Sequence, residues 1–199
     1  MRILIYLLIS ILLVSCDNAS DQIKENDENW INVSDIKVLF SPKNNIDLLM
    51  INKIGEAKRE VCVAIFDLTS EKIKDALIEA HKRGILVRVY NDKNPGPHEQ
   101  PILDELIDAG ISLKIADPKY WNENPENSFF SIMHNKILII DDHTVMTGSY
   151  NFTKNAESNN RENIIMIPNK IITEKFYKQF NIYWKNPWKQ ILQTKKSIV

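Results

Sequence analysis

Residues 134–151 read HNKILIIDDHTVMTGSYN. The apolar run 137–140 predicts a buried β-strand, residues 141–144 supply turn chemistry, and residues 145–147 restart an extended chain. Because side chains alternate along a strand, His134 and Lys136 should share one face with residues 138 and 140. Burying an imidazole and an ammonium costs free energy unless both have partners. The pair therefore indicates a functional site at the end of a core strand.

Polar residues and a glycine of this stretch fall into one pattern, H-x-K-x4-D-x6-G-S-x-N, formed by His134, Lys136, Asp141, Gly148, Ser149 and Asn151. The pattern resembles the HKD motif of the phospholipase D superfamily, and the resemblance extends from about residue 38 to about residue 184. The chain closely resembles the small Nuc-like bacterial endonucleases of that superfamily, which carry one HKD motif per chain. The resemblance implies a phospholipase D-like fold with one half-site per chain.

The rest of the domain alternates between strand and helix patterns. Strands are predicted at 37–41, 61–68, 85–90, 111–116 and 163–167, and helices at 46–58, 71–83, 101–109 and 172–184. Ser70 is the expected N-cap of the second helix, and Gly84 stands where a C′ glycine belongs. Residues 91–97 and 117–131 are predicted loops. We expect an α/β fold with a mixed, mostly parallel sheet flanked by helices on both faces.

The N-terminus predicts export and a lipid anchor. Arg2 precedes an apolar run over residues 3–14, which is short for a membrane span of roughly 20 residues. The run ends in Leu-Val-Ser-Cys at Cys16, which resembles a bacterial lipobox; an uncleaved short anchor is the alternative. We expect a signal peptide at 1–15, the lipidated Cys16 with an acidic flexible tether at 16–35, the catalytic domain at 36–190 and a tail at 191–199. The protein would then be a lipoprotein anchored in the cell envelope.

The motif residues can perform phosphodiester chemistry, which needs a nucleophile, groups that bind the anionic oxygens and an acid for the leaving group. His134 can attack phosphorus and form a phosphohistidine that water later opens. Lys136 can place an ammonium beside the same phosphate, and Ser149 and Asn151 can donate further hydrogen bonds. Asp141, at the strand end, suits a structural or salt-bridging role better than direct chemistry.

The resemblance implies two further features of the site. Glu162 falls where the Nuc-like family has a glutamate that hydrogen-bonds the catalytic histidine, although a surface charge beside Arg161 is the alternative. Because one histidine cannot both attack and protonate the leaving oxygen from opposite sides, the resemblance implies a homodimer. His134 of each chain would then face the other across a two-fold axis.

The remaining histidines and cysteine indicate no cofactor. His81 on a helix and His143 in a turn are expected to face solvent, and His98 is expected in a loop. None of them forms a ligand pattern with acidic residues, so we expect metal-independent catalysis. Cys62, in an apolar strand, is expected to be a small buried residue.

Three interpretations of the substrate remain open. The chain can be a nuclease acting on DNA or RNA, a phospholipase D that releases phospholipid head groups, or a non-catalytic envelope protein. The net charge of −1 gives no general attraction to nucleic acid. Trp121, Phe129 and Phe130 can stack on bases, enter a lipid interface or pack under their loop. The size and single motif favour the nuclease, and the predicted anchor favours the phospholipase.

Overall fold

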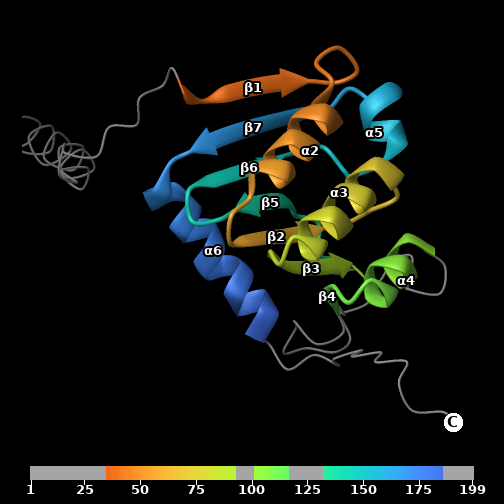
Figure 1. Ribbon diagram of the computed structural model, residues 1–199. Coiled ribbons are helices and arrows are strands. Elements are labelled where there is room, and N and C mark those ends of the chain that lie inside the picture. The colour runs from red at the N-terminus through yellow and green to blue at the C-terminus, as the bar shows by residue number, and fades with distance from the viewer. Residues whose placement is uncertain (1–34, 93–100, 117–131, 186–199) are drawn as a thin grey trace, which may run out of the picture. The chain divides into compact units, whose positions relative to one another are not determined.

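The computed structural model describes residues 35–92, 101–116 and 132–185, which build a seven-stranded sheet (Figure 1). In order across the sheet the strands are β1 (Lys37–Phe40), β7 (Asn163–Pro168), β6 (Thr144–Gly148), β5 (Lys136–Ile140), β2 (Glu60–Ile65), β3 (Leu86–Asp92) and β4 (Ser112–Ala116). Each predicted strand is present, with ends that differ by one to a few residues.

The sheet is mixed, as predicted, but it is not mostly parallel. Only β2 with β3 and β3 with β4 are parallel, whereas the pairs β1–β7, β7–β6, β6–β5 and β5–β2 are antiparallel. The reason lies in the connections, because helices cross from β2 to β3 and from β3 to β4 while a tight turn joins β5 to β6. The expectation that parallel pairing would predominate is therefore wrong.

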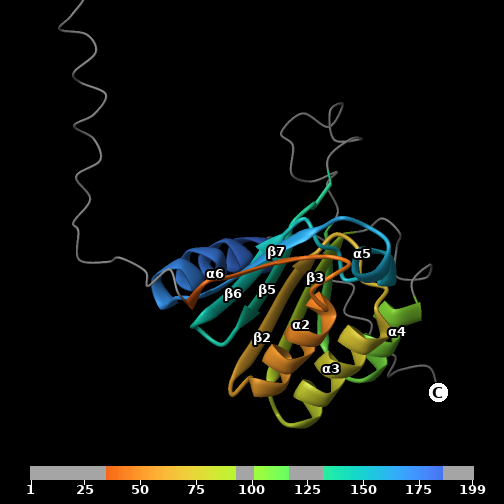
Figure 2. The same ribbon diagram turned by 90° about the horizontal axis from the view of Figure 1, so that it is seen from above.

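Helices cover both faces of the sheet, as expected. The helices α2 (Ile46–Glu56), α3 (Glu71–Lys82) and α4 (Pro101–Asp108) lie on one face, and α6 (Lys170–Lys185) lies on the other (Figure 2). Ser70 caps α3 by accepting a hydrogen bond from the Ile73 amide at 3.4 Å, and Gly84 follows with a φ of +87°. One short helix, α5 (Lys154–Ser158), was not expected from the sequence.

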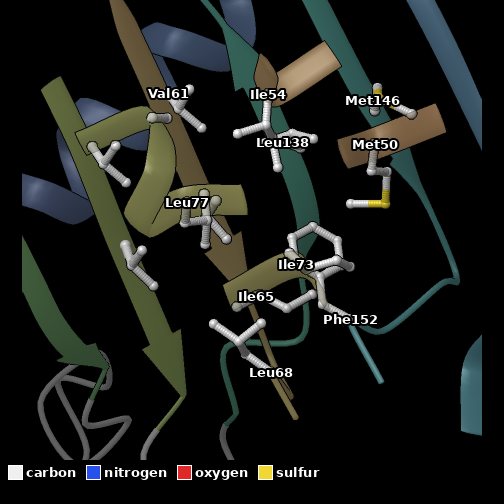
Figure 3. Packing of buried hydrophobic residues seen from close by; sticks show 14 of the residues in the cluster. Met50, Ile54, Val61, Ile65, Leu68, Ile73, Leu77, Leu138, Met146 and Phe152 are labelled. Carbon is white, nitrogen blue, oxygen red and sulfur yellow. The ribbon is translucent and has the colours of Figure 1, made fainter. Parts of the chain in front are cut away.

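Alternating side chains of the central strands fill two apolar layers. Val61, Val63 and Ile65 of β2 pack with Leu138 against α2 and α3 (Figure 3). Cys62 and Ala64 point to the opposite face and join the smaller cluster under α6. Burial on both faces explains why β2 and β5 read as unbroken apolar runs in the sequence. The predicted burial of Cys62 is confirmed, and burial raises the pKa of its thiol.

Some predictions concern residues outside the described ranges. These are the signal peptide, Cys16 and the tether, His98, the loop 117–131 with its aromatic residues, and the tail at 191–199. The predicted loop at 91–97 is only partly described, and its first two residues instead complete β3. Among the helices of the described ranges, none combines the length and the apolar character needed to cross a membrane.

Candidate active site

The motif histidine and lysine lie at one edge of the sheet, where β5 begins. Lys136 pairs with Ile65 near the end of β2, and the amide of Phe66 donates to the Asn135 carbonyl at 3.2 Å. Because β5 runs antiparallel to β2 and β6, its first residues meet the last residues of both neighbours. Five strand termini therefore converge here: the ends of β2, β3 and β6 and the starts of β5 and β7.

The two motif side chains differ in their exposure. His134 precedes β5 and is exposed, whereas Lys136 is buried at 6% relative exposure, so only one of the pair is buried. The Lys136 ammonium donates to the His134 carbonyl at 2.8 Å. The Phe66 ring contacts both groups, edge-on to the imidazole at 5.0 Å between centroids and 5.3 Å from the ammonium. The Phe66 ring therefore lies against both the exposed imidazole of His134 and the buried ammonium of Lys136.

Nearby charges act on both titratable groups. Burial lowers the pKa of Lys136, and the carboxylates that oppose this shift are Glu162, Asp67 and Asp92, in decreasing order. Partial desolvation, and then the Lys136 ammonium, lower the pKa of His134, while Asp92 opposes them. A lowered pKa keeps the imidazole neutral, which is the form that can attack phosphorus.

Glu162 lies directly before β7 and binds Ser149 rather than His134. The Ser149 hydroxyl donates to Oε2 of Glu162 at 2.6 Å, and Asn160 donates to Oε1 at 2.9 Å. The expected hydrogen bond between the imidazole and the Glu162 carboxylate is not present in the described part of the chain. The alternative, a surface charge beside Arg161, does not describe Glu162 either, because Glu162 is half-buried and acts electrostatically on Lys136.

The motif requires glycine at position 148 for a steric reason. A Cβ on Gly148 would lie 2.2 Å from the carbonyl oxygen of Asn163, so this close approach of β6 and β7 admits no side chain. The same approach lets the Ser149 amide donate to that carbonyl at 3.1 Å. Asn151 follows close by, with its Oδ1 buried and without a hydrogen-bond partner in the described residues.

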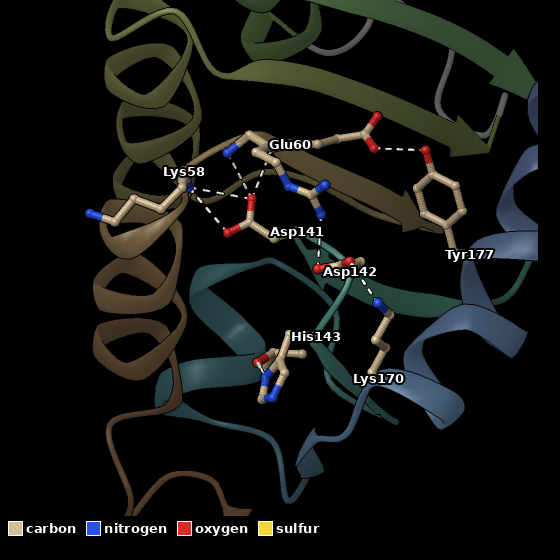
Figure 4. Close-up of polar contacts among 9 residues, drawn as sticks. Lys58, Glu60, Asp141, Asp142, His143, Lys170 and Tyr177 are labelled. Atoms are coloured by element: carbon tan, nitrogen blue, oxygen red, sulfur yellow. Dashed lines mark hydrogen bonds and ion pairs between the residues drawn. The ribbon is translucent and has the colours of Figure 1, made fainter.

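Asp141 lies at the opposite end of β5 and is not part of this site. Its carboxylate accepts from the amides of Lys58, Arg59 and Glu60, at 3.1, 2.8 and 3.0 Å (Figure 4). Its own φ of +54° belongs to the left-handed region, which Asp tolerates better than most residues. Asp141, included among the catalytic candidates, therefore has the structural role that its position at the strand end suggests.

Two other histidines, His81 and His143, lie away from the site. His143 is exposed in the β5–β6 turn, as predicted, but His81 is half-buried on α3. A Cβ on Gly110 would lie 3.2 Å from its Nε2, so His81 packs against that glycine instead of facing solvent freely. No cluster of His, Cys, Asp and Glu in the described ranges could hold a metal ion. Metal independence remains a prediction.

Sequence reasoning missed three residues of the site: Phe66, Asp67 and Asp92. Phe66 and Asp67 directly follow β2, and Asp92 ends β3. The carboxyl ends of parallel strands meet at one edge of a sheet, so acidic residues just after two apolar strands were a usable signal. The predicted loop at 91–97 includes Asp92, yet the carboxylate of Asp92 accepts from the Met133 amide at 2.6 Å and holds the segment before His134.

The site so assembled can bind and attack a phosphodiester. An exposed imidazole supplies the nucleophile, a buried ammonium supplies positive charge, and the segment from Gly148 to Asn151 supplies polar groups beside them. The buried ammonium attracts the phosphate oxygens strongly because water screens it little.

Comparisons with known proteins agree with this chemistry. The family model described as "Cardiolipin synthase, PLD-like domain" matches residues 50–184. The phospholipase D of Rickettsia conorii is 30% identical over 155 residues, which are 78% of this chain and 72% of that protein. The mitochondrial cardiolipin hydrolase of Chlamydomonas reinhardtii is 26% identical over 134 residues, and this chain spans 55% of its length.

Two solved structures share the fold. Nuc from Salmonella typhimurium, a phospholipase D family member, has a TM-score of 0.64 and 32% identity, over 75% of this chain and 93% of Nuc. NucT from Helicobacter pylori has a TM-score of 0.66 and 24% identity, over 75% of this chain and 94% of NucT. With the family model matching most of its length, this chain belongs to the phospholipase D superfamily of phosphodiester hydrolases.

Proposed function

We propose that the chain is an endonuclease that hydrolyses DNA or RNA through a phosphohistidine intermediate on His134. The observation that carries this proposal is the exposed His134 imidazole held beside the buried Lys136 ammonium. A free imidazole nitrogen attacks phosphorus, an N–P bond forms, and the bond from phosphorus to the leaving oxygen breaks. Water then cleaves the N–P bond and restores the histidine. Lys136 balances the negative charge that builds up on the phosphoryl oxygens.

The leaving oxygen needs a proton from the side opposite the attack. Of the histidines in the described ranges, only His134 lies at this sheet edge, because His81 is on α3 and His143 is in the far turn of β5. We therefore propose a homodimer in which His134 of the second copy is the acid.

Light scattering should give the mass of a dimer. Mixing parent with excess His134→Ala chain should inhibit the parent by subunit exchange, and a fully active monomer would contradict the dimer.

Nucleic acid is the first choice of substrate. Its support is the resemblance to the Nuc-like endonucleases, together with 93% coverage of Nuc at 32% identity. Phospholipid is the alternative, supported by the 30% identity to a rickettsial phospholipase D. The lipobox at Cys16 supports it too, because a lipid anchor would hold the domain at a membrane surface.

One experiment separates these substrates. The full-length chain, with His134→Ala as its control, is offered plasmid DNA, single-stranded RNA and vesicles of phosphatidylcholine or cardiolipin side by side, in excess chelator. We expect cleavage of nucleic acid that the variant lacks and that the chelator leaves unchanged. Release of head groups without nucleic-acid cleavage would make the chain a phospholipase D. Activity that a divalent ion restores would contradict metal independence.

We further propose that the chain is an exported lipoprotein anchored through Cys16. Mass spectrometry of the mature protein from a bacterial membrane fraction should show a lipid-modified N-terminal cysteine. Cys16→Ala should remove the modification and release the protein from the membrane. An N-terminus at Met1 without lipid would contradict this proposal.

A further inference from the structure

Asp67 carries an unused acceptor at the centre of the site. It follows the end of β2, next to the Phe66 ring that contacts both His134 and Lys136. Its Oδ1 is buried and has no hydrogen-bond partner in the part of the chain that the structure describes. A buried acceptor without a donor costs about 1–3 kcal/mol, so such an atom calls for an explanation.

The backbone places Asp67 beside the motif. The Phe152 amide donates to the Asp67 carbonyl at 3.1 Å, and Leu68 forms a parallel bridge with Phe152. This contact places the segment of Asp67 alongside the segment of Asn151, whose buried Oδ1 also lacks a partner in the described residues. Two unused acceptors therefore lie on adjoining segments at the edge where Lys136 begins β5.

Lys136 has donors to spare for these acceptors. An ammonium carries three N–H groups, and the one hydrogen bond of Lys136 within the described ranges goes to the His134 carbonyl. Charged groups act on it from three neighbouring strand ends: Asp67 after β2, Asp92 at the end of β3, and Glu162 before β7.

The other two carboxylates are already committed. Glu162 accepts from Ser149 and Asn160, one on each oxygen. Asp92, which is fully buried, accepts from the Met133 amide. Asp67 is the member of this group with a buried oxygen still open. We propose that Asp67 is a positioning residue: it pairs with Lys136, keeps the ammonium charged and holds it toward the phosphate.

This role, which rests on the proposed phosphodiesterase reaction, has a definite consequence. A buried ammonium tends to lose its proton, and a nearby carboxylate opposes that loss. Burial raises the pKa of Asp67 and Lys136 lowers it, as expected for two groups that interact. Without the Asp67 charge, Lys136 should lose its proton at a lower pH. The alkaline limb of activity should then move to lower pH.

The test compares Asp67→Asn with the parent chain by two readouts. In the first, kcat/KM on bis(4-nitrophenyl) phosphate is followed from pH 5 to pH 10, and the ratio of activity at pH 7 to that at pH 9 should rise by about tenfold. In the second, lysine ¹³Cε resonances are titrated by NMR, with Lys136 assigned by its loss in Lys136→Met. The Lys136 midpoint should fall in Asp67→Asn. Asp67→Glu should recover most of both effects.

Glu79→Gln is the matched control, because Glu79 is a carboxylate on α3 whose ion pair with Lys82 is exposed. It should leave the profile and the titration unchanged. An equal loss of activity at every pH with an unmoved Lys136 midpoint would overturn the proposal, since that is what a structural role produces. If Asp67→Asn does not fold, Asp67→Ser is read in the same way. A parent chain that cleaves nothing would contradict the proposed function alone, because the titration still decides on Asp67.

Discussion

The two ends of β5 carry the two halves of one motif and differ in how their polar groups are satisfied. At the Asp141 end, one carboxylate receives three backbone amides. At the Lys136 end, Oδ1 of Asp67 and Oδ1 of Asn151 stay without donors in the described residues, and the imidazole is exposed. Asp141 lies five positions after Lys136, which is about 16 Å along an extended strand. The Asp141 end therefore stabilises the fold, whereas the Lys136 end keeps an exposed imidazole and open acceptors around a buried ammonium.

The largest effect should come from His134→Ala, which removes the nucleophile. We expect kcat to fall by about 10³-fold or more, with thermal unfolding near that of the parent because the side chain is exposed. Kinetics on the best substrate, with calorimetry of the same sample, measure both. Residual activity above a few per cent would show that another residue is the nucleophile.

Asp141→Ala should instead lower stability and leave kcat nearly unchanged. Three amides lose their acceptor and alanine must adopt a φ of +54°, so the free energy of unfolding should fall by about 2–4 kcal/mol. For the folded protein, kcat should stay within about twofold. Urea unfolding compares it with Asp142→Ala, which loses surface ion pairs to Arg59 and Lys170 and should cost under about 1 kcal/mol. A large fall in kcat in a fully folded variant would show that Asp141 contributes to the active site.

Local sequence signals predicted most elements correctly, because apolar runs, the Ser70 cap and Gly84 act over a few residues. Strand directions were less accessible, since the α/β pattern suggested more parallel pairing than the β5–β6 hairpin and its neighbours allow. The motif located His134 and Lys136, but it could not show whether Glu162 reaches the imidazole or Ser149. That choice depends on sideways distances between strands, which no local pattern encodes. Asp67 was missed although its place directly after an apolar strand was a usable local signal.

Glu162→Gln should have a moderate effect. Glutamine can still accept from Ser149 but no longer stabilises the charge of Lys136, so we expect kcat to fall by about tenfold. Asn160→Ala is the control, because it removes one exposed hydrogen bond to the same carboxylate and should change kcat by less than about twofold. Equal effects of the two variants would mean that Glu162 acts only through local structure.

The smallest expected effect is a change in the pKa of His134. Partial desolvation and the positive charge of Lys136 lower the pKa of the imidazole, and the negative charge of Asp92 opposes them. The sign of each substitution follows: Lys136→Met removes a positive charge, so the pKa of His134 should rise and the neutral nucleophile should be lost at a higher pH. Asp92→Asn keeps an acceptor for the Met133 amide but removes the negative charge, so the pKa should fall. Titration of the imidazole ¹³Cε1–H resonance by NMR measures both without any turnover. Shifts in the same direction would show that rearrangement of the segment before β5, and not charge, controls the nucleophile.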